Sequence, residues 1–297
     1  MGVEMISALE CIAANFKLLK LKITIQFQQD TVLPAFKGSM LHGWFGQALK
    51  SADEQAFFIC YGNHDNQQPK PYIICPNNDH KTHWQKGELY SFNISLFGNA
   101  IDLIDTLYVA LKIGERLGLG SNRTPFKVLS VASATPEGYK AGTQIITLAN
   151  ILASNSVKPL IEEDTELAVT FITPTRIKYQ GVICKKAIPD LHFLVNNILR
   201  RLVQLSRFWV MDDQDLFDAL YTYQPLISSH QTTSHCYFED WQRFSKKNGE
   251  HLPFGGLKGQ VSFFGNIAHI TPLLKIGEVL HIGGKTTFGL GRYKLIS

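Results

Sequence analysis

A regular alternation of β-branched runs and amphipathic segments in the second half of the chain most constrains its fold. Residues 166–174, ELAVTFITP, form a β-branched run that Pro174 stops, which predicts a strand. In residues 190–210 apolar side chains recur at intervals of three and four, which predicts a long helix with Asp190 as its N-cap. A strand followed by an amphipathic helix indicates a domain in which helices cover a sheet.

The rest of this half completes a known order of elements. Residues 235–245 and 257–265 predict two strands, and residues 271–283 predict a shorter helix with Thr271 as N-cap. Residues 288–296 predict a last strand. Strand, helix, strand, strand, helix, strand is the ferredoxin-like order, βαββαβ, which RNA-recognition modules share.

The first half shows a similar pattern. Its predicted strands and helices alternate in the order strand, helix, strand, helix, strand, at residues 20–27, 39–50, 87–97, 100–118 and 126–134. We therefore predict an α+β protein of two tandem ferredoxin-like domains. Pro159 and the acidic residues after it indicate a boundary near residue 160, which gives domains of residues 1–160 and 161–297.

Composition limits the class of protein and its compartment. A chain of 297 residues with 45% apolar residues can form packed cores, so disorder is not indicated. We find no signal peptide and no span of 18 apolar residues. The odd set of five cysteines predicts reduced thiols in a cytoplasm. Residues 1–165 carry 14 basic and 15 acidic side chains, and residues 166–297 carry 15 and 10, so the basic excess of the second half favours a polyanionic partner.

Residues 281–295, HIGGKTTFGLGRYKL, contain four glycines and three basic residues close to the end of the chain. A Walker phosphate loop needs a glycine where Val279 stands, and a dinucleotide fingerprint needs a small residue where Lys294 stands, so neither motif fits. Two interpretations remain from the residues alone. One is a tight turn before the last strand, and the other is a loop that binds a ligand.

His42 is a candidate catalytic residue on the helix predicted at residues 39–50. With Ser39 as N-cap, His42 lies in the first helical turn, where the helix dipole disfavours a protonated imidazole. Gly43 and Gly46 give the helix an unusually small surface beside it, so we expect a strand or a ligand to approach the backbone there. The alternative is a histidine that only satisfies local hydrogen bonds.

With these features in view, the sequence resembles the CRISPR-associated repeat-RNA endoribonucleases of the RAMP superfamily, which cut precursor CRISPR RNA into guide units. The resemblance lies in segments spread along most of the chain. These segments are LPAFKGSMLHGWFGQAL, GLGSNRTPFKVLSV, TFITPTRIKYQG, ILRRLVQLS, WQRFSKK and IGGKTTFGLGRY. The last resembles the glycine-rich loop of the superfamily and is the most specific.

The resemblance implies two ferredoxin-like domains that bind RNA at their junction and on the second domain. It also implies cleavage without a metal or other cofactor, which leaves a 2′,3′-cyclic phosphate and a 5′-hydroxyl. SMLHGWFGQAL resembles the pattern that bears the catalytic histidine in one branch of the family, although many relatives have arginine there. His42 is therefore the candidate general base, and Lys37 and Lys50 are candidates to stabilise charge at the phosphate.

Two segments are predicted to bind RNA. In the glycine-rich loop, glycine backbone N–H groups and two basic side chains are expected to approach the RNA strand, at Gly283, Gly284, Lys285, Thr286, Gly289, Gly291 and Arg292. Basic residues interleave with Trp241 and Phe244 in the second segment, which suits phosphate contact and base stacking, at Arg243, Lys246 and Lys247. An exposed strand end with ordinary charges is the alternative for this second segment.

A metal site is not expected. Cys60, His64, Cys75, His80 and His83 fall within 24 residues, but their intervals match no standard zinc spacing.

Three functions fit the sequence. The first is an endoribonuclease that binds precursor and mature CRISPR RNA. The second is a RAMP-fold subunit that holds guide RNA in an effector complex with other CRISPR proteins and does not cut it. The third, suggested by element order alone, is an unrelated ferredoxin-like enzyme of small-molecule metabolism.

Overall fold

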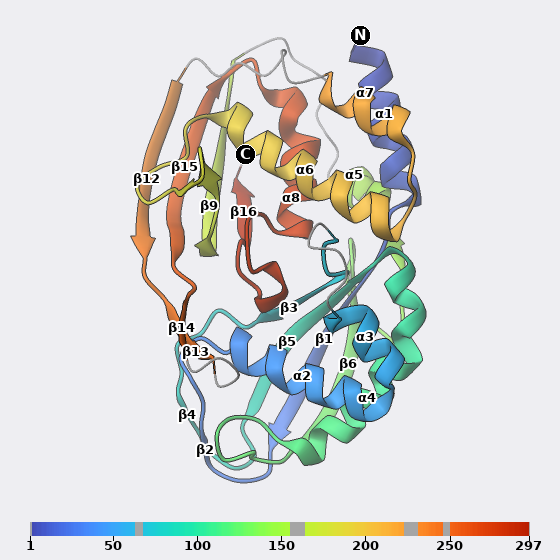
Figure 1. The fold of residues 1–297 in the computed structure, drawn as a ribbon, viewed down its shortest axis with the longest axis vertical. Coiled ribbons are helices and arrows are strands. Elements are labelled where there is room, and N and C mark those ends of the chain that lie inside the picture. The colour runs from blue at the N-terminus through green and yellow to red at the C-terminus, as the bar shows by residue number, and fades with distance from the viewer. Residues whose placement is uncertain (1, 63–67, 155–163, 223–230, 246–249, 297) are drawn as a thin grey trace. The chain divides into compact units, whose positions relative to one another are not determined.

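The computed structural model describes residues 2–62, 68–154, 164–222, 231–245 and 250–296 (Figure 1). The chain forms two compact units. The N-domain comprises Phe16–Thr147 with Phe208–Met211, and the C-domain comprises Met1–Asn15, Leu148–Arg207 and Asp212–Ser297. The boundary that we expected near residue 160 lies outside the described residues.

The first helix belongs to the C-domain, although the N-domain follows it in the sequence. Helix α1 (Gly2–Asn15) packs against α5 (Leu148–Ser154) and α7 (Gln214–Tyr221), as Figure 1 also shows for α1 and α7. Leu9 and Ile12 are buried side chains of this helix. Compared with the expected domain of residues 1–160, the N-domain lacks residues 1–15 and Leu148–Ser154 and includes Phe208–Met211. Residues of α1 belong to the C-domain because α1 packs against segments that follow residue 147.

The N-domain has a ferredoxin-like sheet with two covering helices. The antiparallel strands have the spatial order β3-β5-β1-β6-β7, and β8 also pairs with β1. Their bounds are β1 (Lys17–Phe27), β3 (Tyr72–Pro76), β5 (Leu89–Phe97), β6 (Phe126–Thr135), β7 (Gly138–Ala141) and β8 (Ile146–Thr147). Helices α2 (Gly38–Ala52) and α4 (Ile104–Leu117) lie beside each other over this sheet (Figure 1). The path β1-α2-β3-β5-α4-β6 confirms the predicted order and adds the strand β3.

Strand β3 was not predicted because its pattern is uninformative. All five of its residues are buried, so the alternation that marks a half-exposed strand is lost. Two smaller elements of the N-domain were also not predicted. These are the pair β2 (Thr31–Val32) with β4 (His83–Trp84), and the helix α3 (Glu54–Tyr61).

The core of the N-domain lies between the sheet and the two helices. Every second side chain of β1 lies in this core, at Leu21, Ile23 and Ile25, together with the partner residues on β5. A single glycine allows the two helices to approach, because a Cβ at Gly114 would clash with the indole of Trp44. Trp44 also donates its indole N–H to the carbonyl oxygen of Gly114 at 3.1 Å. Helix α4 is thereby held against α2.

The C-domain repeats the same topology with the strand order β12-β15-β9-β16. The sheet strands are β9 (Thr165–Thr175), β12 (Gln231–Glu239), β15 (Gly256–Gly265) and β16 (Tyr293–Ile296), and the main helices are α6 (Leu191–Trp209) and α8 (Thr271–Leu280). Two small hairpins extend it, β10 (Lys178–Tyr179) with β11 (Val182–Ile183), and β13 (Gln242–Ser245) with β14 (Glu250–Pro253). The predicted α+β fold of two tandem ferredoxin-like domains is confirmed.

Several predicted ends in the C-domain are shifted. Asp190 caps α6 as predicted, since its Oδ1 accepts from the backbone N–H of Phe193 at 2.7 Å. The segment predicted as one strand at residues 235–245 is divided between β12 and β13. Helix α8 ends at Leu280, and β16 begins only at Tyr293, because Gly289 and Gly291 between them have φ of 82° and 73°. Such angles do not occur within a regular strand.

Among the described residues, none of the helices combines the length and the apolar character that crossing a bilayer requires.

Glu115 connects α4 to the sheet of the N-domain. Its Oε1 accepts from the backbone N–H of Val128 at 2.8 Å and from Lys112 Nζ at 3.2 Å, and Lys127 Nζ lies 3.7 Å from Oε2. Burial raises the pKa of this carboxyl, but the hydrogen bonds and the two lysines outweigh burial, so the pKa lies below its ordinary value. A carboxyl with a lowered folded-state pKa stabilises the fold above its unfolded pKa and loses that contribution as the pH falls through its folded pKa.

We therefore expect Glu115→Ala to destabilise the N-domain by about 1–3 kcal/mol, because the N–H of Val128 loses its acceptor. The loss should be complete above about pH 5, where an unfolded glutamate is ionised, and should shrink at lower pH. Thermal melting across this pH range measures it. Glu137→Ala, which removes an exposed ion pair with Lys140, is the control and should leave the melting temperature unchanged. Equal melting curves for both variants would contradict the role of Glu115.

Candidate functional site

His42 lies in the first half of α2, and the residues before it differ from the predicted cap. The helix begins at Gly38 with Lys37 as N-cap residue, and the backbone N–H of Leu41 donates to the carbonyl oxygen of Lys37 at 2.9 Å. Ser39, the predicted N-cap, is already inside the helix. The helix starts one residue earlier than predicted because Lys37 is fixed at this point by its own side chain, as described below.

A small aromatic cluster surrounds His42. Its Nε2 lies 3.0 Å from the hydroxyl of Tyr72, and its ring centroid lies 4.8 Å from that of Tyr61. The hydroxyl of Tyr61 donates to the backbone carbonyl oxygen of His42 at 2.8 Å. At Gly46 the close approach that we predicted comes from Tyr61 of helix α3 and not from a strand, since its ring carbon would lie 2.9 Å from a Cβ there. A Cβ at Gly43 would have no neighbour within 4 Å among the described residues.

The hydrogen bonds of this cluster hold the His42 ring in a defined orientation. Tyr61 donates its hydroxyl proton to the His42 carbonyl oxygen. The Tyr72 hydroxyl and Nε2 of His42 are hydrogen-bonded, and the donor of this bond depends on the tautomer of the imidazole. Burial raises the pKa of both tyrosines well above the usual value, so both keep their protons at neutral pH.

Lys37 has a structural role. Its side chain is fully buried, and Nζ lies 2.7 Å from Oδ1 of Asp79 and 3.3 Å from the carbonyl oxygen of Ala35. The same Nζ lies 5.7 Å from the ring centroids of both Trp84 and Tyr90. A buried ammonium that is held in an ion pair cannot also contact a phosphate. The expectation that Lys37 stabilises charge during cleavage is therefore wrong.

Lys50 differs from Lys37 because it is exposed. Its Nζ lies 3.8 Å from Glu54 and 5.6 Å from the ring centroid of Phe57, which stacks on Tyr61 with a centroid distance of 5.1 Å. Eight helical residues separate Lys50 from His42, which corresponds to about 12 Å along the axis. Lys50 and His42 thus flank a row of two aromatic rings, and a part for Lys50 in charge stabilisation stays a prediction.

The glycine-rich loop of the C-domain is held tightly against the end of β9. The N–H of Gly284 donates to the Arg176 carbonyl at 2.8 Å, and the N–H of Gly291 donates to the Pro174 carbonyl at 3.1 Å. Thr173 Oγ1 donates to the Gly289 carbonyl at 2.9 Å. A Cβ at Gly283 would clash with the carbonyl oxygen of Arg176. Packing within the C-domain therefore requires a glycine at residue 283.

This geometry changes the predicted role of the glycines. The N–H groups of Gly284, Gly289 and Gly291 all donate to carbonyl oxygens of the protein, so they are not available to an RNA phosphate. Gly289, Gly291 and Thr286 are also buried, whereas Gly284 and Lys285 are exposed. RNA contact by this loop, which stays a prediction, then depends on its exposed segment around Lys285 and on the side chain of half-buried Arg292.

The structure describes only some of the basic residues that we predicted to bind RNA. Lys285 has φ of 67°, and its Nζ lies 5.5 Å from the ring centroid of Phe254. Arg243 lies in β13, where its backbone pairs with that of Leu252 in β14. Lys246 and Lys247 lie outside the described residues.

The proposed zinc ligands do not form a cluster among the described residues. No group of three or more histidine, cysteine or acidic side chains there could hold a metal ion. Cys60 and Cys75 are buried, and burial raises the pKa of the Cys60 thiol to about 12, which opposes the thiolate that zinc needs. His80 and His83 are exposed, and His64 lies outside the described residues.

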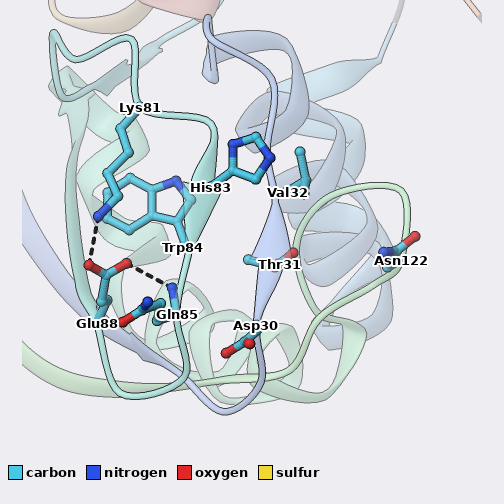
Figure 2. A pocket seen from close by; sticks show the side chains of 9 residues that line it. All are labelled: Asp30, Thr31, Val32, Lys81, His83, Trp84, Gln85, Glu88 and Asn122. Atoms are coloured by element: carbon cyan, nitrogen blue, oxygen red, sulfur yellow. Dashed lines mark hydrogen bonds and ion pairs between the residues drawn. The ribbon is translucent and has the colours of Figure 1, made fainter.

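An open pocket of about 510 Å³ lies at the paired strands β2 and β4 of the N-domain (Figure 2). It is lined by Asp30, Thr31, Val32, Lys81, His83, Trp84, Gln85, Glu88 and Asn122. Lys81 and Glu88 form an ion pair at 2.6 Å, and Lys81 Nζ lies 4.6 Å from the ring centroid of Trp84. Two carboxylates, Asp30 and Glu88, line this pocket against one lysine, so its charge does not select a polyanion. His42 is not among its lining residues.

Comparisons with known proteins support the resemblance. Residues 169–293 match the family model described as CRISPR-associated endoribonuclease Cas6, and residues 16–55 and 60–157 match a model described as an N-terminal domain. An uncharacterized protein of Archaeoglobus fulgidus is 23% identical over 311 residues, which is 95% of this chain and 99% of that protein. The second model begins at residue 16, where the N-domain begins.

Solved structures share the fold. A structure titled Cas6 product complex has a TM-score of 0.61 at 17% identity over 94% of this chain and all of that chain. Thermus thermophilus Cas6 has a TM-score of 0.56 at 15% identity over 95% of this chain and 99% of that chain. A partial Cas6-RT-Cas1–Cas2 complex has a TM-score of 0.64 at 13% identity over 95% of this chain, which spans 46% of that longer chain.

The family resemblance is thus confirmed for residues 169–293, which match the Cas6 family model. These residues, which include most of the C-domain sheet and the glycine-rich loop, are the Cas6-related part of the chain. Of the residues in the His42 cluster, Tyr61 and Tyr72 were missed by sequence reasoning. Tyr72 lies on the unpredicted strand β3, 30 residues from His42, and no periodicity connects the two.

Removing the buried cation is expected to destabilise the N-domain. Lys37→Met leaves Asp79 without its partner, and we expect a loss of about 3 kcal/mol, measured by thermal melting. Lys50→Met is the matched control on the same helix and should change the melting temperature little, because Lys50 is exposed. Equal stability of Lys37→Met and wild type would refute the structural role.

Two glycines of the loop should respond differently to alanine. Gly291 has a positive φ, and a Cβ there would clash with the carbonyl oxygen of Ile282, so Gly291→Ala should cost about 2 kcal/mol or more. Gly284 does not have a positive φ, and a Cβ there would have its nearest neighbour at 3.8 Å, so Gly284→Ala should be nearly neutral. Thermal melting of both variants tests this difference. Similar losses of stability at the two positions would contradict it, because only Gly291 lacks room for a Cβ.

Proposed function

We propose that this protein binds CRISPR repeat RNA and cleaves precursor CRISPR RNA into guide units. The proposed reaction is metal-independent transesterification, which leaves a 2′,3′-cyclic phosphate and a 5′-hydroxyl. The observation that carries the proposal is the hydrogen-bonded cluster of His42, Tyr72 and Tyr61, which holds the imidazole in a defined orientation. A neutral imidazole of defined orientation is suited to accept a proton.

The chemistry needs few groups. The 2′-oxygen forms a bond to phosphorus while the His42 imidazole takes the 2′-hydroxyl proton, and the bond from phosphorus to the 5′-oxygen breaks. The departing 5′-oxygen takes up a proton from water. Negative charge accumulates on the phosphorane, and Lys50 is our candidate to stabilise it. Tyr72 does not react; it is a positioning residue because its hydroxyl is hydrogen-bonded to the His42 ring.

The C-domain is proposed to bind the RNA. Its half of the sequence carries the basic excess, and the exposed part of the glycine-rich loop contributes Lys285 beside Gly284. Arg243, Lys246, Lys247 and Arg292 complete the proposed phosphate contacts. The mature CRISPR RNA and other CRISPR proteins are proposed partners, since one structural neighbour is a Cas6-RT-Cas1–Cas2 complex. A cytoplasmic location is part of the same proposal.

A second function has an observation in its favour. The Cas6 model matches residues 169–293 and so does not include His42, which lies in a region that matches a different model. A RAMP subunit that binds guide RNA without cutting it would need only the C-domain surface. The third alternative, an enzyme of small-molecule metabolism, has no observation that favours it.

Cleavage of cognate repeat RNA under single-turnover conditions in EDTA tests the proposal. We expect His42→Ala to lower the cleavage rate by about 10²- to 10⁴-fold, because a positioned general base contributes that much. Tyr72→Phe should lower the rate less and leave RNA affinity unchanged, since Tyr72 acts through His42. The wild-type rate should fall at acidic pH, because a protonated imidazole cannot accept the 2′-hydroxyl proton.

Two controls separate the alternatives. RNA with 2′-deoxyribose at the scissile position should bind but not be cut. If His42→Ala cleaves as fast as wild type, His42 is not the base. If wild type binds the repeat and cuts neither in EDTA nor in Mg²⁺, the non-cleaving subunit is the correct reading. Absence of binding at low salt, where phosphate contacts are strongest, would refute both.

A further inference from the structure

A basic hairpin, which we define as residues 176–186, follows β9 directly. It contains β10 and β11, joined by a tight turn at Gln180 and Gly181, whose φ angles are 48° and 82°. The surrounding residues 167–189 contain four basic side chains and no aspartate or glutamate. The basic residues are Arg176, Lys178, Lys185 and Lys186. All charged side chains of the hairpin are therefore basic.

The base of the basic hairpin is fixed in the C-domain. Ile177 and Cys184 are buried, and the N–H of Cys184 donates to the carbonyl oxygen of Ile177 at 2.9 Å. Arg176 forms a backbone bridge with Gly284 of the glycine-rich loop, and its guanidinium donates to the carbonyl oxygen of Gly255 at 2.7 Å. The basic hairpin thus begins beside the exposed segment that carries Lys285.

The tip of the basic hairpin exposes apolar surface. Tyr179 and Val182 lie directly opposite each other, and 46% and 69% of their surfaces are exposed. The Tyr179 ring meets the Phe193 ring nearly perpendicularly, at a centroid distance of 5.5 Å, which restricts its orientation. Lys178, Lys185 and Lys186 of the same hairpin are exposed, and Lys185 Nζ lies 5.6 Å from the ring centroid of Phe238.

An oriented, exposed aromatic ring among lysines is the chemistry that binds single-stranded nucleic acid. A base can stack on the ring while the lysines neutralise the phosphates on either side of it. A neutral protein surface could pack against Tyr179 and Val182, but it would desolvate the three lysines without giving them charged partners. The charge therefore favours RNA as the occupant.

We propose that the basic hairpin is a second RNA contact of the C-domain, at which Tyr179 stacks on an unpaired base of the repeat RNA. Lys178, Lys185 and Lys186 neutralise the adjacent phosphates. This inference rests on the proposed RNA binding and is independent of cleavage by His42. It adds a single-stranded segment to the RNA that the protein recognises.

Binding of repeat RNA, measured by fluorescence anisotropy with catalytically inactive His42→Ala protein, tests the stacking. We expect Tyr179→Ala to weaken binding about tenfold and Tyr179→Phe to bind like the parent, because either aromatic ring can stack. Tyr139→Ala is the matched control, since Tyr139 is 56% exposed on β7 of the N-domain, and it should not change affinity. A 2-aminopurine base placed at successive unpaired positions should be quenched at one position by the parent and not by Tyr179→Ala.

The salt dependence tests the phosphate contacts without relying on Tyr179. The triple variant with glutamine at Lys178, Lys185 and Lys186 should lower the slope of log affinity against log salt by about 2, because each contact with a single strand contributes about 0.7. A merely structural role would not change this slope. If the parent binds RNA but Tyr179→Ala and the triple variant match it in affinity and slope, the inference is wrong while the proposed function stands. If the parent binds no RNA, the proposed function itself fails.

Discussion

The backbone contacts between the end of β9 and the glycine-rich loop hold that loop in place on the C-domain. Three groups at or just after the end of β9, the Thr173 hydroxyl and the carbonyls of Pro174 and Arg176, form hydrogen bonds with the loop. Such contacts require the two backbones to approach closely, which glycine permits and a Cβ at Gly283 or Gly291 would prevent. The loop is therefore an extension of the sheet, and the side chains it exposes are held on a fixed backbone.

Binding and chemistry are located in different domains. His42 and its tyrosine partners belong to the N-domain, whereas the basic excess and the Cas6-related segment belong to the second half of the chain. If the proposed function holds, a change in the aromatic cluster removes cleavage and leaves the proposed RNA-binding surface intact. Such a separation would let one fold serve both as a nuclease and as a passive carrier of RNA.

Sequence periodicity predicted those parts of the fold in which helices and strands are half-exposed. The long amphipathic helix α6 and its Asp190 cap are confirmed, because both depend on neighbouring residues only. Strand β3 was missed because it is buried on both sides and shows no alternation. In the candidate site, the prediction for Lys37 failed because its contact is not local in the sequence. Lys37 was taken for a surface lysine because its partner, Asp79, is 42 residues away, and no local pattern indicates that pair.

The glycine-rich loop shows the same limit. Four glycines close together predicted a backbone that approaches something closely, which is correct. What they approach is the protein itself, and this could not be read from the loop, because the acceptors lie on β9, more than a hundred residues earlier. Tyr72 is a similar case, since only the pairing of β3 in the sheet explains why it reaches His42.

The placement of α1 has a consequence for how the chain folds during synthesis. The N-domain is inserted, in sequence, between α1 and the remainder of the C-domain. Helix α1 leaves the ribosome before the N-domain, but α5 and α7, against which it packs, follow more than 130 residues later. The N-domain core can form from a nearly continuous segment, whereas the C-domain must close a loop the length of a whole domain. The nascent chain therefore carries an amphipathic helix that waits for its partners while the N-domain is made.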